Sequence, residues 1–235
     1  MGKEIELFDS LLLHINHGKA SLTGQQHDRG LNFLIGVLLS RAFNSLWRAR
    51  EDAVVGYAPE SLTVCRSAME HWIASRWVEL NPEARDHWLW EIFEEVSRPI
   101  GGIPGPTVMV KELGSLAESV TDIYGALSKF AHPRGTGLRW VIHFDAESTY
   151  FHVGLHFDHG ALKLCLYFLM GTAQACLEPV ARLQNRMLGR VDDEWLTEGN
   201  RLSEVAGAFM ESIEVEVKAR AAKLPPVEED QTGID

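Results

Sequence analysis

The stretch VKELGSLAESVTDIYGALSKFA, residues 110–131, shows the pattern that decides the fold class. Its apolar side chains recur in steps of three and four residues, as the buried face of a helix requires. They are Leu113, Leu116, Val120, Ile123, Leu127 and Phe130. We therefore expect one helix from residue 110 to residue 131, ending before His132-Pro133 because the position before a proline disfavours helical backbone.

Helical periodicity extends over most of the chain on both sides of this stretch. The predicted helices cover residues 4–17, 31–53, 59–80, 159–188 and 193–223, and a further helix follows Asn81-Pro82 and ends near residue 97. Residues 98–107, RPIGGIPGPT, hold three prolines and three glycines and are predicted to lack regular structure. The pattern favours a bundle of packed helices.

One segment, residues 139–157, alternates with a period of two instead. When residue 143 is paired with residue 152 across a loop at residues 146–149, the apolar side chains gather on one face, as in a β-hairpin packed on helices. His143 then lies opposite His152 with Asp145 on the same face, a set of ligands that zinc accepts. Such histidines are more often simply exposed, and neither an HExxH motif nor a cysteine ligand accompanies them. No metal site and no cofactor is predicted.

The sequence thus predicts an all-α fold, a bundle of about seven helices with one β-hairpin at about residues 139–157 inserted before the sixth helix. At 235 residues with 46% hydrophobic content, the chain can bury one sizeable core. We expect a single helical domain over residues 1–224, followed by a disordered acidic tail at residues 225–235.

The charge balance narrows the function classes. Acidic residues outnumber basic ones by 33 to 22, and the formal net charge of −11 disfavours general binding to the phosphate backbone of nucleic acids. Cys65, Cys165 and Cys176 lie in apolar helical patterns and are expected to be reduced core residues. The N-terminus lacks the pattern of a signal peptide, and the most apolar run, residues 164–177, is shorter than the roughly 20 residues of a membrane span. We expect a cytoplasmic protein without a membrane partner.

Two polar residues interrupt the apolar stripe of the helix predicted at residues 59–80. Arg66 lies inside the apolar sector, and Glu70 lies at its edge one helical turn further on. A buried arginine is seldom unpaired, because its guanidinium group cannot lose its charge. The pair is interpreted either as a structural ion pair that fixes helix register or as a cation that faces an anionic substrate.

Tyr124, Ser128 and His132 form a second polar set along one edge of the 110–131 helix. His132 lies at the C-terminal end, where the helix dipole favours the imidazolium ion, and it could act as a general acid or base with Ser128 as its partner. The alternative is that Ser128 and His132 cap the helix end and bind Glu70 or a backbone carbonyl group. The candidate catalytic residues are Arg66, Glu70, Ser128 and His132, and the candidate ligand-binding residues are Tyr124 and Arg134.

Four of the seven tryptophans, Trp72, Trp77, Trp88 and Trp90, lie close together in the sequence. With neighbouring arginines and histidines they could stack on bases or line a ligand pocket. At helical spacing such residues also form a core or a dimer interface, where aromatic side chains are enriched. A homodimer is the preferred interpretation.

The two polar sets together resemble a pattern found in a broad group of uncharacterised bacterial helical proteins. The pattern consists of Arg66-x3-Glu70 and Tyr124-x2-Leu127-Ser128-x3-His132-Pro133. This group brings no settled activity that could be carried over to the present chain.

A more distant similarity is to HEPN proteins, helical domains that dimerise and often act as metal-independent ribonucleases in toxin or defence systems. Their motif is an arginine, about four to six residues and a histidine, and Arg66 and His71 match this spacing. His71 lies about 140° round the helix from Arg66. A HEPN-like site in this chain would therefore bring Arg66 and His132 together across helices.

Two functions are compatible with these patterns. The preferred one is a cytoplasmic, homodimeric helical protein whose polar cluster orders the fold or binds a small anionic ligand. The alternative is a HEPN-like enzyme acting on RNA, with His132 as general acid or base and Arg66 stabilising negative charge at the scissile phosphate.

Overall fold

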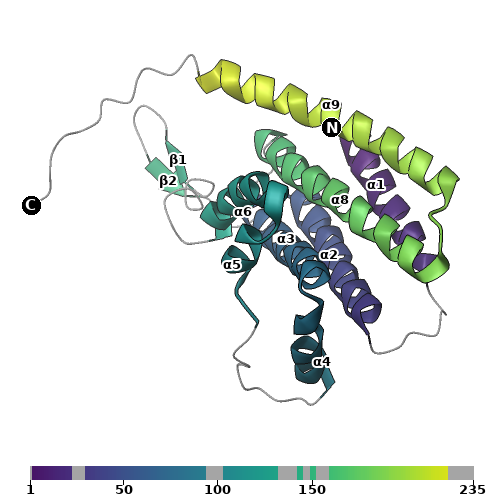
Figure 1. Ribbon diagram of the computed structural model, residues 1–235. Helices are drawn as coiled ribbons and strands as arrows, with labels where there is room; N and C mark the ends of the chain where they lie inside the picture. The colour runs from purple at the N-terminus through teal and green to yellow at the C-terminus, as the bar shows by residue number, and fades with distance from the viewer. Residues whose placement is uncertain are drawn as a thin grey trace, which may run out of the picture.

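The computed structural model describes residues 2–22, 30–93, 103–131, 142–144, 149–151 and 159–221. Within them the chain forms eight α-helices, so the predicted all-α class is confirmed for this part of the protein (Figure 1). The helices are α1 (Gly2–Ala20), α2 (Leu31–Val54), α3 (Ala58–Leu80), α4 (Arg85–Phe93), α5 (Pro106–Lys111), α6 (Ala117–Ala131), α8 (His159–Leu188) and α9 (Asp193–Ala221). Short 3-10 turns, η1 (Pro82–Ala84) and η2 (Gly114–Leu116), precede α4 and α6.

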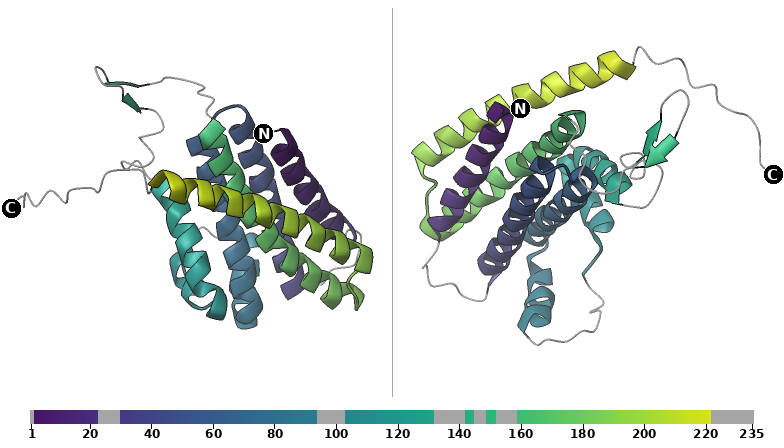
Figure 2. Two further views of the ribbon diagram at one scale, coloured as in Figure 1. Left: turned by 90° about the horizontal axis from the view of Figure 1, so that it is seen from above. Right: turned by 180° about the vertical axis from the view of Figure 1, so that it is seen from behind.

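The central helix of the bundle is α8. It contacts α1, α2, α3 and α9, whereas α5 and α6 pack on α3. Figure 2 shows α2 beside α3 and α1 beside α9 from two further directions. The helix α3 therefore faces α2, α8 and α6 at once, and the polar groups that it carries can meet partners from more than one neighbour.

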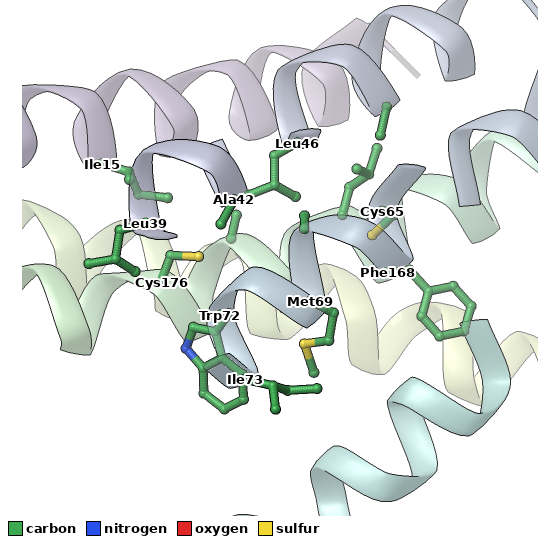
Figure 3. Close-up of a cluster of buried hydrophobic side chains, with 14 of the residues drawn as sticks. Ile15, Leu39, Ala42, Leu46, Cys65, Met69, Trp72, Ile73, Phe168 and Cys176 are labelled. Carbon is green, nitrogen blue, oxygen red and sulfur yellow. The ribbon is translucent and has the colours of Figure 1, made fainter. Parts of the chain in front are cut away.

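The core lies where α1, α2, α3 and α8 meet (Figure 3). Ile15, Leu39, Met69 and Phe168 are among the buried apolar side chains that these four helices contribute. The three cysteines, Cys65, Cys165 and Cys176, are free and buried, as predicted. Burial raises the pKa of each of these thiols to about 12, so they stay protonated and behave as small apolar residues.

The helix α8 is long and apolar enough, by length and composition, to cross a membrane. Its most apolar window has a mean hydropathy of 1.3, and 56% of that window is buried inside the fold. A central helix in contact with four neighbours has the same apolar character, because it must bury more than one face. The cytoplasmic location therefore stays a prediction.

The prediction of one continuous helix over residues 110–131 is wrong. The chain forms α5, breaks, and begins α6 at Ala117. Gly114 has a φ of +63°, in the left-handed region that interrupts a right-handed helix. Periodicity survives across the break because Leu113 still reaches the core. The expectation of no regular structure over residues 98–107 is also wrong at its end, since Pro106 begins α5, where its fixed φ is favourable.

Most of the predicted hairpin, residues 139–157, lies outside the described residues. The described part consists of β1 (Ile142–Phe144) and β2 (Thr149–Phe151), which pair antiparallel. His143 is opposite Tyr150, so the predicted pairing of His143 with His152 is wrong by two residues. Thr149 belongs to β2 rather than to the predicted loop, and its branched side chain favours strand backbone.

The helix α9 buries only part of its apolar surface. Leu202, Ala206 and Ile213 are buried, whereas Val205 and Val217 are 45% and 54% exposed. The helix packs on both α8 and α1, and its buried residues lie on the side that meets these two helices. Its start is held by Trp195, which stacks on the His14 ring at 4.7 Å and donates a hydrogen bond to the His14 carbonyl oxygen at 2.9 Å.

Gly18 lets α1 approach α8 and α9 closely, and this approach gives a test of the packing. A Cβ atom at residue 18 would lie 2.7 Å from the Trp195 ring and 2.8 Å from Val180 Cγ1. We expect Gly18→Ala to lower the free energy of unfolding by about 1 to 3 kcal/mol, because both neighbours must move. Urea unfolding followed by circular dichroism measures this change.

Gly207→Ala on α9 is the matched control, since a Cβ atom there meets nothing within 4 Å. It should leave the protein as stable or raise its stability by about 0.5 to 1 kcal/mol, the usual gain of alanine over glycine in a helix. Equal stability of the two variants would contradict the close packing of α1 on α8 and α9.

Candidate functional site: a polar clamp between α3 and α6

Arg66 and Glu70 lie one turn apart on the face of α3 that meets α6. Arg66 Nη2 is 3.1 Å from Glu70 Oε1, so the predicted ion pair forms. The side chains are 25% and 33% exposed, at the rim of the contact between the helices rather than in its centre. Their mutual attraction is therefore partly screened by water.

Tyr124 of α6 completes the arrangement. Its hydroxyl group accepts a hydrogen bond from Arg66 Nη2 at 2.9 Å and donates one to Glu70 Oε1 at 2.8 Å. The Arg66 guanidinium group also lies 5.2 Å from the centre of the Tyr124 ring, within the range of a cation–π contact. We call these three residues the Arg66–Tyr124–Glu70 clamp, because they join α6 to α3 through one closed set of polar contacts.

The position of Tyr124 follows from the local sequence of α6. Val120 and Leu127, four residues before and three residues after it, are buried against the core and turn this face of the helix towards α3. Tyr124 therefore lies in the contact between α6 and α3 and is only 9% exposed. Its hydroxyl group reaches the polar residues of α3.

Burial and hydrogen bonding fix the protonation states in the clamp. Burial, together with the hydrogen bond to Glu70, raises the pKa of the Tyr124 hydroxyl group. Burial disfavours the charge of Arg66, but the hydrogen bond to Tyr124 and the charge of Glu70 outweigh it and raise the pKa of the guanidinium group. The phenol therefore stays protonated and the guanidinium group stays charged at physiological pH.

The remaining candidate residues of this helix have different outcomes. Ser128 Oγ donates a hydrogen bond to the Tyr124 carbonyl oxygen at 2.7 Å, one turn back in its own helix, which is the backbone-carbonyl contact of the alternative interpretation. His132 and Arg134 lie outside the described residues. Their roles as general acid or base and as ligand-binding residue stay predictions.

His71 does not join Arg66. Its Nδ1 atom is 2.6 Å from the Ser67 carbonyl oxygen of its own helix. Burial lowers the pKa of the His71 imidazole, and the charge of Arg41 on α2 lowers it further. Arg66 meets α6 while His71 lies near α2, so the two residues of the HEPN-like spacing face different helices, as the helical wheel predicted.

Two of the clustered tryptophans are core residues of this chain. Trp72 and Trp77 are buried, and their indole N–H groups donate hydrogen bonds at 2.6 Å to the Ala175 carbonyl oxygen and to Glu112 Oε2. The core alternative therefore holds for these two residues, which are not available to stack on bases or on a partner subunit, and the homodimer itself stays a prediction. Trp88 is half-buried, and nothing is described of the Trp90 side chain.

A second ionic cluster was missed at the sequence level. Glu79 of α3, only 10% exposed at its side chain, binds Arg76 and Arg186 and lies 3.5 Å from Arg182 Nε. Arg182 also pairs with Glu178 at 2.9 Å. The available signal was the pair of cations one turn apart on the apolar helix α8, which needed an acidic partner on a neighbouring helix.

Comparisons with protein-family models, with curated proteins and with solved structures find no match for this chain. The resemblances seen in the sequence therefore stay predictions, and the function has to be argued from the residues themselves.

The Tyr124 hydroxyl group is the one atom that contacts both charged residues of the clamp, so its removal tests the clamp most directly. We expect Tyr124→Phe to lower the free energy of unfolding by about 1 to 2 kcal/mol, because Arg66 loses an acceptor and Glu70 loses a donor in a partly dry contact. Urea unfolding measures the loss.

Tyr57→Phe is the matched control. Tyr57 is exposed, and within the described part of the chain its hydroxyl group makes no hydrogen bond. This variant should change the unfolding free energy by less than about 0.5 kcal/mol. If Tyr124→Phe lost no more than Tyr57→Phe, the hydrogen bonds of the clamp would not stabilise the fold.

Proposed function

We propose that this is a non-enzymatic helical protein in which the Arg66–Tyr124–Glu70 clamp orders the fold by fixing α6 on α3. The observation that carries the proposal is the closed set of contacts among the three side chains. A cation that already faces a carboxylate at 3.1 Å has little attraction left for a substrate phosphate. The clamp therefore suits the joining of two helices better than the binding of an anion.

The position of the clamp supports the same proposal. The helix α6 packs on α3 and α5, whereas α8 is buried among four other helices. A helix with one packed face can slide by a turn at little cost in apolar contact, and a polar contact that is satisfied in one register opposes such a slide. Homodimer formation is part of the proposal as a sequence prediction, with Trp72 and Trp77 excluded from the interface.

A double-mutant cycle on Arg66 and Glu70 tests whether the clamp stabilises the fold. Arg66→Met, Glu70→Gln and the double variant should show a coupling free energy of about 0.5 to 1 kcal/mol, the upper range for partly exposed pairs, because Tyr124 connects the two groups. The exposed pair Lys218 and Glu214 on α9, at 3.7 Å, is the matched control. Its cycle should give a coupling near zero, and equal couplings for the two pairs would argue against an ordering role.

One observation favours the alternative, a HEPN-like metal-independent ribonuclease. Arg66 Nε is buried and has no hydrogen-bond partner among the described residues. This donor could bind a phosphate oxygen only after the guanidinium group turns towards solvent, with His132 as the general acid or base.

An assay on RNA separates the two functions. We expect the purified chain to leave single-stranded RNA intact in the presence of EDTA, because Glu70 neutralises Arg66. Gel electrophoresis of end-labelled RNA measures cleavage. Cleavage that Arg66→Ala and His132→Ala each abolish, and that Lys218→Ala retains, would overturn the non-enzymatic proposal.

A further inference from the structure

An open cleft lies between α1, α2 and α8, away from the clamp. Its volume is about 580 Å³, within the range of small-molecule sites, and none of its lining residues comes from α6. Asn16 and Lys19 line it from α1, Ser40 and Arg41 from α2, and Leu183 and Met187 from α8. The cleft therefore shares no lining residue with the clamp and lies in another part of the fold.

Among the described residues that line the cleft, the charges are all of one sign. Of its thirteen lining residues two are cations, Lys19 and Arg41, and none is acidic. This is unusual in a chain with a formal net charge of −11. Carboxylates that oppose arginines at other contacts between helices, such as Glu70 and Glu79, have no counterpart among these lining residues.

The surroundings of Lys19 make an anion favourable there. Its ammonium group lies 4.4 Å from the centre of the Phe43 ring and has no ion pair within the described ranges. Burial lowers the pKa of this amine, which means that the charged form is held at a cost. An anionic group in the cleft would offset that cost, because opposite charges in a partly dry site attract more strongly than in water.

The rest of the cleft is suited to an apolar body. Phe33, Val37, Leu183 and Met187 provide apolar surface, and Asn16, Asn32 and Ser40 provide neutral polar groups. We propose that this cleft binds a small organic anion, attracted by the charges of Lys19 and Arg41 that line it, with its apolar part against α2 and α8. The proposal goes beyond the ordering role of the clamp and places the anionic ligand expected from the sequence at a different site.

Titration with 8-anilinonaphthalene-1-sulfonate, an organic anion whose fluorescence rises on binding, tests the proposal. Lys19→Gln and Arg41→Gln should each weaken binding of this probe about five- to tenfold, since each removes one of the two charges. Lys218→Gln and Arg201→Gln remove exposed cations of α9 and are the matched controls, with no change expected. Equal losses in all four variants would overturn the proposal, because they would report net charge alone.

Gly36 offers a variant that fills the cleft without touching its charges. A Cβ atom at residue 36 would lie 3.8 Å from Leu183 Cδ2, an ordinary contact, and Gly36 lines the cleft, so the longer side chain of Gly36→Leu is expected to extend into it. This variant should abolish probe binding while its thermal unfolding and circular dichroism remain those of a folded protein. Retained binding would place the probe elsewhere and overturn the proposal. If Gly36→Leu fails to fold, Lys19→Glu replaces it, since reversal of the charge should abolish binding and retained binding would again overturn the proposal.

Competition identifies the ligand class. Decanoate should displace the probe at a concentration at least about tenfold lower than decanol, which has the same chain length and no charge. At the concentration at which decanoate displaces the probe, inorganic phosphate should leave the probe bound. Equal competition by decanol would reveal a purely apolar cleft, and equal competition by phosphate would reveal a simple anion site. Either result would overturn the proposal. Tyr124→Phe should bind the probe normally, so a failure of the clamp is distinguishable from a failure of the cleft.

Discussion

The fold depends on the burial of α8 among α1, α2, α3 and α9. Fully burying one leucine-sized side chain contributes about 1.5 to 3 kcal/mol, and α8 buries Leu162, Leu166 and Leu169 among others. In a helix enclosed in this way, most buried polar groups need a partner within the protein. Thr172 Oγ1 accordingly lies 3.6 Å from Cys65 Sγ, and Gln184 Nε2 donates to the Gly18 carbonyl oxygen at 3.1 Å. Apolar burial thus sets the position of α8, and a few hydrogen bonds fix its rotation.

Along α3, charged residues are paired where the helix meets a neighbouring helix. The Arg66–Tyr124–Glu70 clamp joins α3 to α6, and Glu79 joins α3 to Arg182 and Arg186 of α8. In both places a carboxylate and at least one guanidinium group face each other, so the charges are compensated inside the protein. Paired charges of this kind stabilise one register of the neighbouring helices. They also leave only a weak electrostatic field outside the pair. This pairing explains why polar residues inside an apolar stripe need not mark a catalytic centre.

The sequence predicted those features that depend on neighbours along the chain. The bounds of α8 agree with the prediction, and α2 ends one residue later than expected, because polar and glycine-containing segments separate apolar periodic stretches. The pairing of Arg66 with Glu70 was expected from one helical turn. Other features depend on backbone conformation or on distant segments. Periodicity does not reveal the positive φ of Gly114, and no local pattern joins Glu79 to two arginines more than a hundred residues away.

The contrast between compensated and uncompensated cations decides where an anion would bind. Arg66 meets Glu70 at 3.1 Å, so an approaching anion finds an attraction and a repulsion of similar size. Lys19 and Arg41 line an open cleft whose described lining residues include no carboxylate, so no residue among them cancels the attraction. At a separation of about 4 Å the interaction of two unit charges ranges from about 1 kcal/mol in water to about 4 kcal/mol near a protein surface. These charges and the apolar wall support the proposed site for a small organic anion, which would keep the structural charges and the binding charges of the chain in separate places.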